Sequence, residues 1–315
     1  MVLLYPIESL KHTVFEDEYC LAFFREHGVL MTSNISEADV FLLRKTSAST
    51  IIDFQKYLMD NGIPPKPILV WTHEPRFAKT DLDRIDIEGF CSLHVMNLYT
   101  RTVYFSNLTF YGSNVDRLLT PRSDVSFSKI PIVALAGYVS ERSSEMMLNG
   151  LNIDLTVKRQ KLLLKGSEVG LIAIYGRNWP DSMNIFESRG AGWHQAKLNI
   201  LEKYQFNVAM ENTSFDYYCT EKIWDSIKSY CLPIYSSYNN KIYDLFPKNS
   251  FIDVDEFSGN DELLKYLKMM SKKEYLGRLN SCVQVFNHVY ETTDMRSEKQ
   301  QSLTAIIDKL GQIVG

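Results

Sequence analysis

Two α/β domains joined by a short linker are the fold that this sequence predicts, and three observations predict it. Short apolar runs alternate with helical patterns along most of the chain, as in parallel sheets covered by helices. The chain has 315 residues, more than the roughly 250 at which a single hydrophobic core stops growing. The pattern lapses between Asp116 and Lys129, which indicates a linker. We therefore expect domains over residues 1–120 and 130–290.

The first domain begins with strand and helix signals in alternation. We expect strands at MVLLYPI, ADVFLLR and KPILVWTHEP, and helices over about residues 10–25 and along STIIDFQKYLMDNG, where Gly62 closes the second helix. Shorter apolar segments follow at CSLHVMNLY and VYFSNLTFYG. The third strand ends at His73 and Glu74, so both side chains are expected at the carboxyl edge of the sheet.

The second domain repeats the alternation. Strands are expected at IPIVALAGYV, LIAIYG, residues 206–210 and LPIYS, and helices at LTVKRQKLLLKG, near 195–203, and after Thr220, which can cap a helix. In that last helix Ile223, Trp224, Ile227 and Cys231 recur at helical spacing. Three further helices are expected from Asp261 to the end, and residues 291–315 form a helical C-terminal tail.

Composition excludes several classes of protein. A net charge of −4 and a pI near 5.9 give no basic surface for nucleic acid. No run approaches the roughly 18 apolar residues of a membrane span, although peripheral membrane association stays open. Five scattered cysteines without a C-x-x-C pair indicate reduced thiols rather than a zinc site or disulfides. We therefore expect a cytoplasmic protein, with a soluble fragment of a Golgi enzyme as the alternative.

The segment from Tyr204 to Ser237 carries the chemistry. A polar, aromatic loop, ENTSFDYY, stands between a strand and a helix, at the sheet edge where open α/β sheets bind ligands. Lys222 falls in the first turn of that helix, where backbone N–H groups and the helix dipole also favour an anion. The neighbouring Cys219 is a potential nucleophile, but a small residue that fills a tight turn is the better interpretation.

This segment resembles the α-1,3-fucosyltransferase family. The motifs ENTS, DYYCTEK, LPIY and PKNSFIDV occur in the family's order, close over residues 198–257 and looser over KRQKLL, IAIYGRNW and ILVWTHEP. The resemblance implies a GT-B-like architecture of two Rossmann-like domains facing a cleft. It implies that GDP-fucose binds the C-terminal domain and that the acceptor binds the N-terminal one.

The family's donor-binding residues carry over to matching positions. The resemblance implies that Lys222 contacts the diphosphate, that Glu221 binds the ribose hydroxyls and that Tyr218 lies near guanine. It also implies that Asn212 lies close to the donor sugar. For Glu211, a substrate role and a structural role bonded to loop amides stay open.

A second cation is expected in VKRQKLLLKG, which contains Lys158, Arg159 and Lys161. We choose Arg159, because a guanidinium can bind two phosphate oxygens at once. Arg142 is a possible substitute, since GYVSERSSEM departs from the family pattern before this helix.

The general base is expected in the other domain. Glu74 stands where the family carries its base glutamate, in a shorter E-P context, and His73 is the alternative. The D-x-D pairs at Asp81–Asp83 and Asp253–Asp255 are short enough to arise by chance, so we expect no metal and no cofactor besides the donor substrate.

The favoured function is an inverting, metal-independent fucosyltransferase that acts on a glycan hydroxyl, α-1,3 to a GlcNAc- or Glc-type sugar. Two alternatives stay open: a GT-B transferase that uses another nucleotide sugar, and a non-catalytic nucleotide- or glycan-binding module. Ser236, Ser237 and Tyr238 replace the glycine-containing turn of the family near the donor sugar, so fucose and another hexose both stay open as the transferred sugar.

Overall fold

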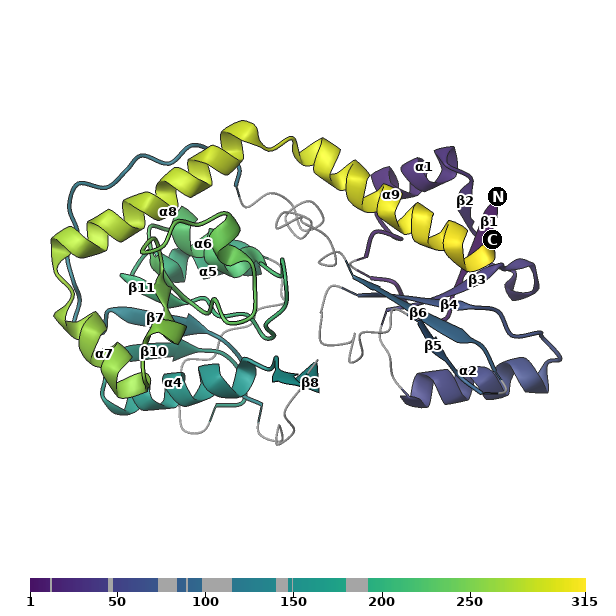
Figure 1. The fold of residues 1–315 in the computed structure, drawn as a ribbon, viewed down its shortest axis with the longest axis horizontal. Coiled ribbons are helices and arrows are strands. Elements are labelled where there is room, and N and C mark those ends of the chain that lie inside the picture. Colours follow the sequence, from purple (N-terminus) through teal and green to yellow (C-terminus); the bar gives the residue numbers. More distant parts are fainter. Residues whose placement is uncertain are drawn as a thin grey trace. The chain divides into compact units, whose positions relative to one another are not determined.

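The computed structural model describes residues 1–11, 13–44, 48–72, 84–88, 90–97, 115–139, 147–148, 150–179 and 192–315. The chain divides into two compact units (Figure 1). Unit 1 comprises Met1–Tyr111, Met147–Leu151 and Asp294–Gly315, and unit 2 comprises Gly112–Met146 and Asn152–Thr293.

Unit 1 is built on a six-stranded sheet in the order β2-β1-β3-β4-β6-β5. Its strands are β1 (Val2–Pro6), β2 (Val29–Met31), β3 (Val40–Leu43), β4 (Ile68–Thr72), β5 (Arg84–Asp86) and β6 (Ser92–Asn97). All neighbouring strands are parallel except β5 and β6. On one face, α1 (Glu18–Glu26) and α9 (Met295–Val314) pack around Leu4 and Leu42, and on the other, α2 (Ala48–Asp60) packs against Phe41.

Helix α1 is shorter than the sequence predicted. The expected helix over residues 10–25 begins only at Glu18. The Thr13 hydroxyl donates to Leu10 O at 2.6 Å and accepts from Phe15 N, a local turn that competes with helical hydrogen bonds. Asp17 then caps α1 by accepting from Cys20 N at 2.9 Å.

Unit 2 is built on a five-stranded, wholly parallel sheet in the order β10-β7-β11-β12-β13. Its strands are β7 (Ile132–Leu135), β10 (Ile172–Tyr175), β11 (Phe206–Val208), β12 (Leu232–Tyr235) and β13 (Ile252–Asp253). Its helices are α4 (Thr156–Glu168), α5 (Trp193–Leu201), α6 (Glu221–Lys228), α7 (Asn260–Met269) and α8 (Lys272–Thr292). The chain also forms β8 (Met147–Leu148), β9 (Leu151–Asn152) and the 3₁₀ turns η1 (Ile35–Glu37), η3 (Ile242–Asp244) and η4 (Val254–Glu256).

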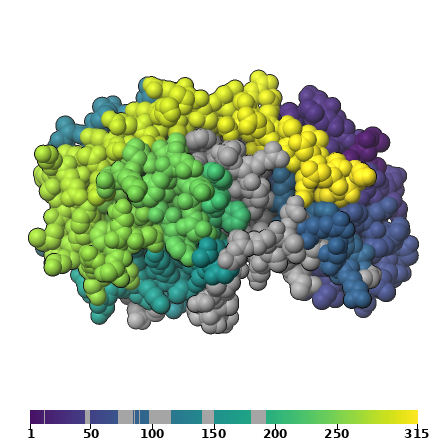
Figure 2. Space-filling model, viewed as in Figure 1, coloured from purple at the N-terminus to yellow at the C-terminus, as the bar shows by residue number. Residues whose placement is uncertain are grey.

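The three helices predicted after Asp261 are confirmed as α7, α8 and α9. The last of them, expected as a C-terminal tail, buries Leu303, Ile306 and Leu310 in the core of unit 1. In Figure 2 the yellow-green residues of α7 and α8 form part of the surface of unit 2.

The predicted linker is held against α8. Asn287 bonds both the N–H and the carbonyl of Leu119, and Asn280 does the same for Arg122, with all four distances between 2.8 and 2.9 Å. Among the described residues, no helix combines the length and the apolarity that a membrane crossing needs.

Candidate active site

A cavity of about 600 Å³ opens at the carboxyl edge of the unit 2 sheet. From β7 the chain passes through α4 to β10 on one side, while β11 lies on the other side of β7. The cavity therefore lies where the strand order reverses, the place where open α/β sheets bind ligands. The segments after β7, β10 and β11 line it together with side chains of α4, α5 and α6.

Gly176 lines the cavity and lets the ends of β7 and β10 approach each other closely. A Cβ at this position would lie 2.0 Å from Ala136 O, so no larger residue fits without a backbone shift. In the sequence this glycine is only the last residue of the strand signal LIAIYG, which does not indicate its role at the cavity.

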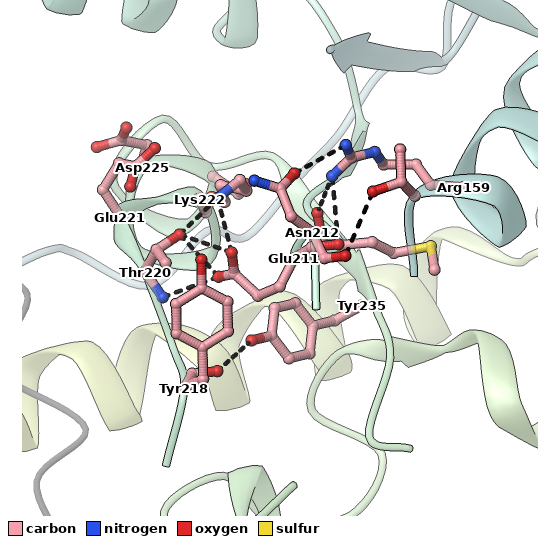
Figure 3. A network of polar contacts seen from close by, with 12 residues as sticks. Arg159, Glu211, Asn212, Tyr218, Thr220, Glu221, Lys222, Asp225 and Tyr235 are labelled. Carbon is pink, nitrogen blue, oxygen red and sulfur yellow. Dashed lines mark hydrogen bonds and ion pairs between the residues drawn. The ribbon is translucent and has the colours of Figure 1, made fainter. Parts of the chain in front are cut away.

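Arg159 extends from α4 into the cavity wall and is 6% exposed. Its Nη1 donates to Met210 O at 2.8 Å, and its Nη2 donates to Asn212 Oδ1 at 3.0 Å (Figure 3). Of the three basic residues considered in this helix, Arg159 lines the cavity, whereas Lys158 bonds Asp255 and Lys161 is exposed. The structure therefore brings together Arg159 and Asn212, which were both predicted to lie near the donor.

Glu211 holds the beginning of α6. Its carboxylate is 2% exposed and accepts from the Thr220 N–H and hydroxyl, each at 2.8 Å, and from Lys222 Nζ at 2.6 Å (Figure 3). Thr220 is the N-cap residue, but its side chain makes no capping hydrogen bond of its own. Of the two roles that the sequence left open for Glu211, these contacts support the structural one.

Glu221 and Lys222 both reach the cavity from the first turn of α6. Lys197 of α5 lies 3.4 Å from Glu221 Oε1 and 2.7 Å from Asp225 Oδ2. Burial by itself raises the pKa of Glu221, but the ammonium groups of Lys222 and Lys197 outweigh burial and lower that pKa to about 2. The Asp225 and Glu221 carboxylates likewise outweigh burial at Lys197 and raise its pKa. Glu221 and Lys197 are therefore both charged at neutral pH.

Tyr218 lies away from the cavity lining. It is 2% exposed, and its carbonyl accepts from the Tyr235 hydroxyl at 3.4 Å (Figure 3). Cys219 is fully buried, and burial raises the pKa of its thiol well above the usual range, which disfavours the nucleophilic thiolate.

Several predicted residues lie outside the described part of the chain. These are His73, Glu74, Asp81, Asp83 and Arg142. The other D-x-D pair supports the turn after β12: Asp253 accepts from Ser237 and Tyr243, and Asp255 accepts from Ser236 and Tyr238 N.

Helix α5 contributes to the cavity in a way that the sequence did not predict. Trp193 and Lys197 line the cavity, yet the sequence predicted only a helix near 195–203. Their spacing of four residues places them on one helix face, but that spacing alone does not show that the face meets a ligand cavity.

A parallel α/β sheet with a charged cavity at the reversal of its strand order is the arrangement in which open α/β proteins bind their ligands. The fold is similar to that of T4 phage BGT in complex with UDP and Mn2+, with a TM-score of 0.50 and 9% identity over 98% of this chain and 99% of that one. A crystal structure of an alpha1,3-fucosyltransferase with GDP-fucose matches with a TM-score of 0.46 and 15% identity, covering 93% of this chain and 91% of that chain. The two α/β units with their mainly parallel sheets and the similarity to the T4 phage protein, at a TM-score of 0.50, indicate a GT-B-like fold.

The chain belongs to glycosyltransferase family 10 (fucosyltransferase), whose C-terminal region matches residues 140–301. It is 39% identical to an alpha-(1,3)-fucosyltransferase of Helicobacter pylori over 85 residues, 26% of this chain. It is 34% identical to an alpha-(1,4)-fucosyltransferase of Arabidopsis thaliana over 80 residues, 25% of this chain. The matched segments span only 18% and 20% of the lengths of these two relatives.

Proposed function

We propose that this protein transfers L-fucose from GDP-fucose to a hydroxyl of a glycan acceptor, with inversion at the anomeric carbon. Membership of family 10 and the names of the two relatives support the transferred sugar. The observation that carries the proposal is the position of Glu221 and Lys222, side by side in the first turn of α6 on a cavity that Arg159 also lines. The linkage that we propose is α-1,3 to a GlcNAc- or Glc-type sugar.

In the proposed reaction the acceptor oxygen forms a bond to the anomeric carbon as the bond from that carbon to the diphosphate breaks. Negative charge develops on departing GDP, and Lys222, Arg159 and the N-terminus of α6 stabilise it. Asn212, whose Oδ1 is held by Arg159, is placed next to these groups. We propose that the two cations act without a metal ion.

The acceptor hydroxyl must lose a proton as its oxygen attacks. We propose Glu74 as the base that receives this proton, with His73 as the alternative.

We further propose that the enzyme is cytoplasmic, which its five free cysteines support.

Thermal-shift titration with GDP and UDP tests the donor, because a ligand that binds the folded state raises its unfolding temperature. GDP should give the larger shift, and transfer of fucose from GDP-fucose to an N-acetyllactosamine acceptor should survive EDTA. Equal shifts with both nucleotides would favour another nucleotide sugar. GDP binding without transfer to any glycan acceptor would favour a non-catalytic module.

Two variants separate donor binding from proton transfer. Glu74→Gln should lower kcat by about 10²–10⁴ with little change in GDP affinity. Lys222→Ala should weaken GDP binding as well as turnover, because its charge acts on the diphosphate before and during transfer. If Glu74→Gln keeps more than about a third of kcat, the base is elsewhere and His73 is the next residue to test.

A further inference from the structure

Helix α5 presents two residues to the cavity that the proposed reaction does not use. Trp193 and Lys197 are four positions apart and therefore lie on one face of α5. Both line the cavity beside Glu221. Lys197 Nζ lies 6.0 Å from the centroid of the Trp193 ring, so the two side chains form one local surface.

Asp225 holds Lys197 in place. Its side chain is 8% exposed, and Asp225, its partner at 2.7 Å, is 0% exposed. A lysine this deeply buried is rare without a charged partner. The remaining contact of Lys197 is directed to Glu221 Oε1 at 3.4 Å, and the Glu221 side chain is 28% exposed. Asp225 therefore fixes Lys197, and Lys197 in turn directs a partly accessible carboxylate.

We propose that Trp193, Lys197 and Glu221 form the nucleoside subsite of the donor cavity. Trp193 stacks on the base, and Lys197 is a positioning residue that orients Glu221 toward the ribose diol. This inference rests on the proposed function, which supplies a nucleoside diphosphate as the ligand. It names the groups that distinguish a nucleoside diphosphate from a bare diphosphate.

The geometry suits this division of the ligand. Lys222 follows Glu221 in the same helical turn, and Arg159 reaches the cavity from α4, so cations for the diphosphate come from α4 and α6. The indole comes from α5, and Lys197 of α5 holds the Glu221 carboxylate of α6 at 3.4 Å. A carboxylate accepts hydrogen bonds from two vicinal hydroxyls, and an indole stacks on any base. The subsite therefore gives affinity for the nucleoside, while guanine selectivity needs further polar groups.

Calorimetric titration with GDP, inorganic pyrophosphate and 2′,3′-dideoxy-GDP tests the subsite. Trp193→Ala should weaken GDP by about 5- to 150-fold and leave pyrophosphate within about twofold. Trp193→Phe should restore most of the GDP affinity. Gln195→Ala, on the exposed side of α5, should change neither ligand. Lys222→Ala should weaken both ligands together.

The role of Lys197 is tested in a charge-balanced variant, because removing one partner of a buried ion pair can unfold the protein. In wild type, GDP should bind at least about tenfold more tightly than its dideoxy analogue. The double variant Lys197→Met with Asp225→Asn should lose most of that difference while pyrophosphate binding is kept. Glu221→Gln should lose it as well.

The outcomes separate the subsite from the proposed donor. If wild type binds no GDP, the donor assignment is wrong and the subsite is wrong with it. If wild type binds GDP but Trp193→Ala weakens GDP and pyrophosphate equally, or not at all, only the base-stacking role is overturned. If the double variant keeps the full preference for GDP over dideoxy-GDP, Lys197 does not position the ribose-binding carboxylate.

Discussion

Two lysine–carboxylate clusters lie on either side of the first turns of α6, and they differ in access to solvent. In the first cluster, Lys222 is 23% exposed and binds Glu211, which is 2% exposed. In the second, Lys197 is 8% exposed and binds Asp225, which is 0% exposed. Both join a lysine to a buried carboxylate, yet only Lys222 leaves a substantial part of its side chain accessible.

This difference in access separates two uses of a positive charge. A lysine that is almost inaccessible to solvent, as Lys197 is, orients the carboxylates that it contacts. A lysine that is anchored on one side and accessible on the other can meet an incoming anion. Lys222 donates to Glu211 and Thr220 on its anchored side, while 23% of its side chain is accessible where it lines the cavity. Glu221 lies between the clusters. Burial raises its pKa, but the ammonium groups of Lys222 and Lys197 lower it by more.

The largest expected loss in the free energy of unfolding comes from removing a carboxylate of the more buried cluster. Asp225→Ala removes the partner of Lys197 at 2.7 Å and of His194 Nε2 at 3.1 Å, and it leaves the buried Lys197 ammonium with Glu221 at 3.4 Å. Such a change should lower the free energy of unfolding by about 3–5 kcal/mol in urea titration. Lys272→Ala, which removes an exposed ion pair with Asp124, is the matched control and should leave the free energy of unfolding nearly unchanged. Equal losses in both variants would show that burial does not distinguish these pairs.

Glu221 interacts with the lysines of both clusters. Neutralising it should have the next largest effect on the free energy of unfolding. Its folded-state pKa of about 2 lies below the ordinary 4.5, so its charge contributes stability above pH 4.5 that is lost as pH falls through 2. Glu221→Gln should therefore reduce the unfolding free energy by about 2 kcal/mol at pH 6, after allowance for partial exposure. The difference from wild type should shrink between pH 4.5 and 2.

Urea titrations of both proteins at several pH values measure this difference directly. Glu168→Gln is the control, since its carboxylate is 71% exposed and its lysine partner is 3.6 Å away. Its difference from wild type should stay small at every pH. A pH-independent difference for Glu221→Gln would mean that the two lysines do not stabilise its charge.

The sequence predicted the elements whose pattern is local. The helical spacing of Ile223, Trp224 and Ile227 predicted α6, and all three are fully buried. Likewise, short apolar runs predicted β7, β10, β11 and β12 at the edge that carries the cavity. In contrast, β2 and β13 were not predicted, because strands of three and two residues give no apolar run long enough to recognise. Strand β11 also has three residues, but it was predicted because its apolar run continues to Met210.

Contacts between distant residues could not be predicted in the same way. Glu211 bonds Thr220 nine positions away, and Lys197 meets Asp225 only because α5 packs beside α6. A family motif indicated Glu221, Lys222 and Arg159, which line the cavity, and also Tyr218, which is buried outside the lining. The motif thus located the ligand-facing turn, while the groups that hold this turn follow from tertiary packing.

The smallest effect should come from Thr220, in the more accessible cluster. Its hydroxyl donates to Glu211 and accepts from Lys222 Nζ at 2.7 Å. In Thr220→Val a methyl group replaces the hydroxyl, but Glu211 still accepts from the backbone N–H at 2.8 Å and from Lys222. The unfolding free energy should therefore fall by only about 1 kcal/mol, and Thr220→Ser, which keeps the hydroxyl, should recover most of it. A loss as large as that of Asp225→Ala would show that the Lys222 cluster depends on its internal bonds as strongly as the buried cluster does, and that Lys222 is not poised for a ligand.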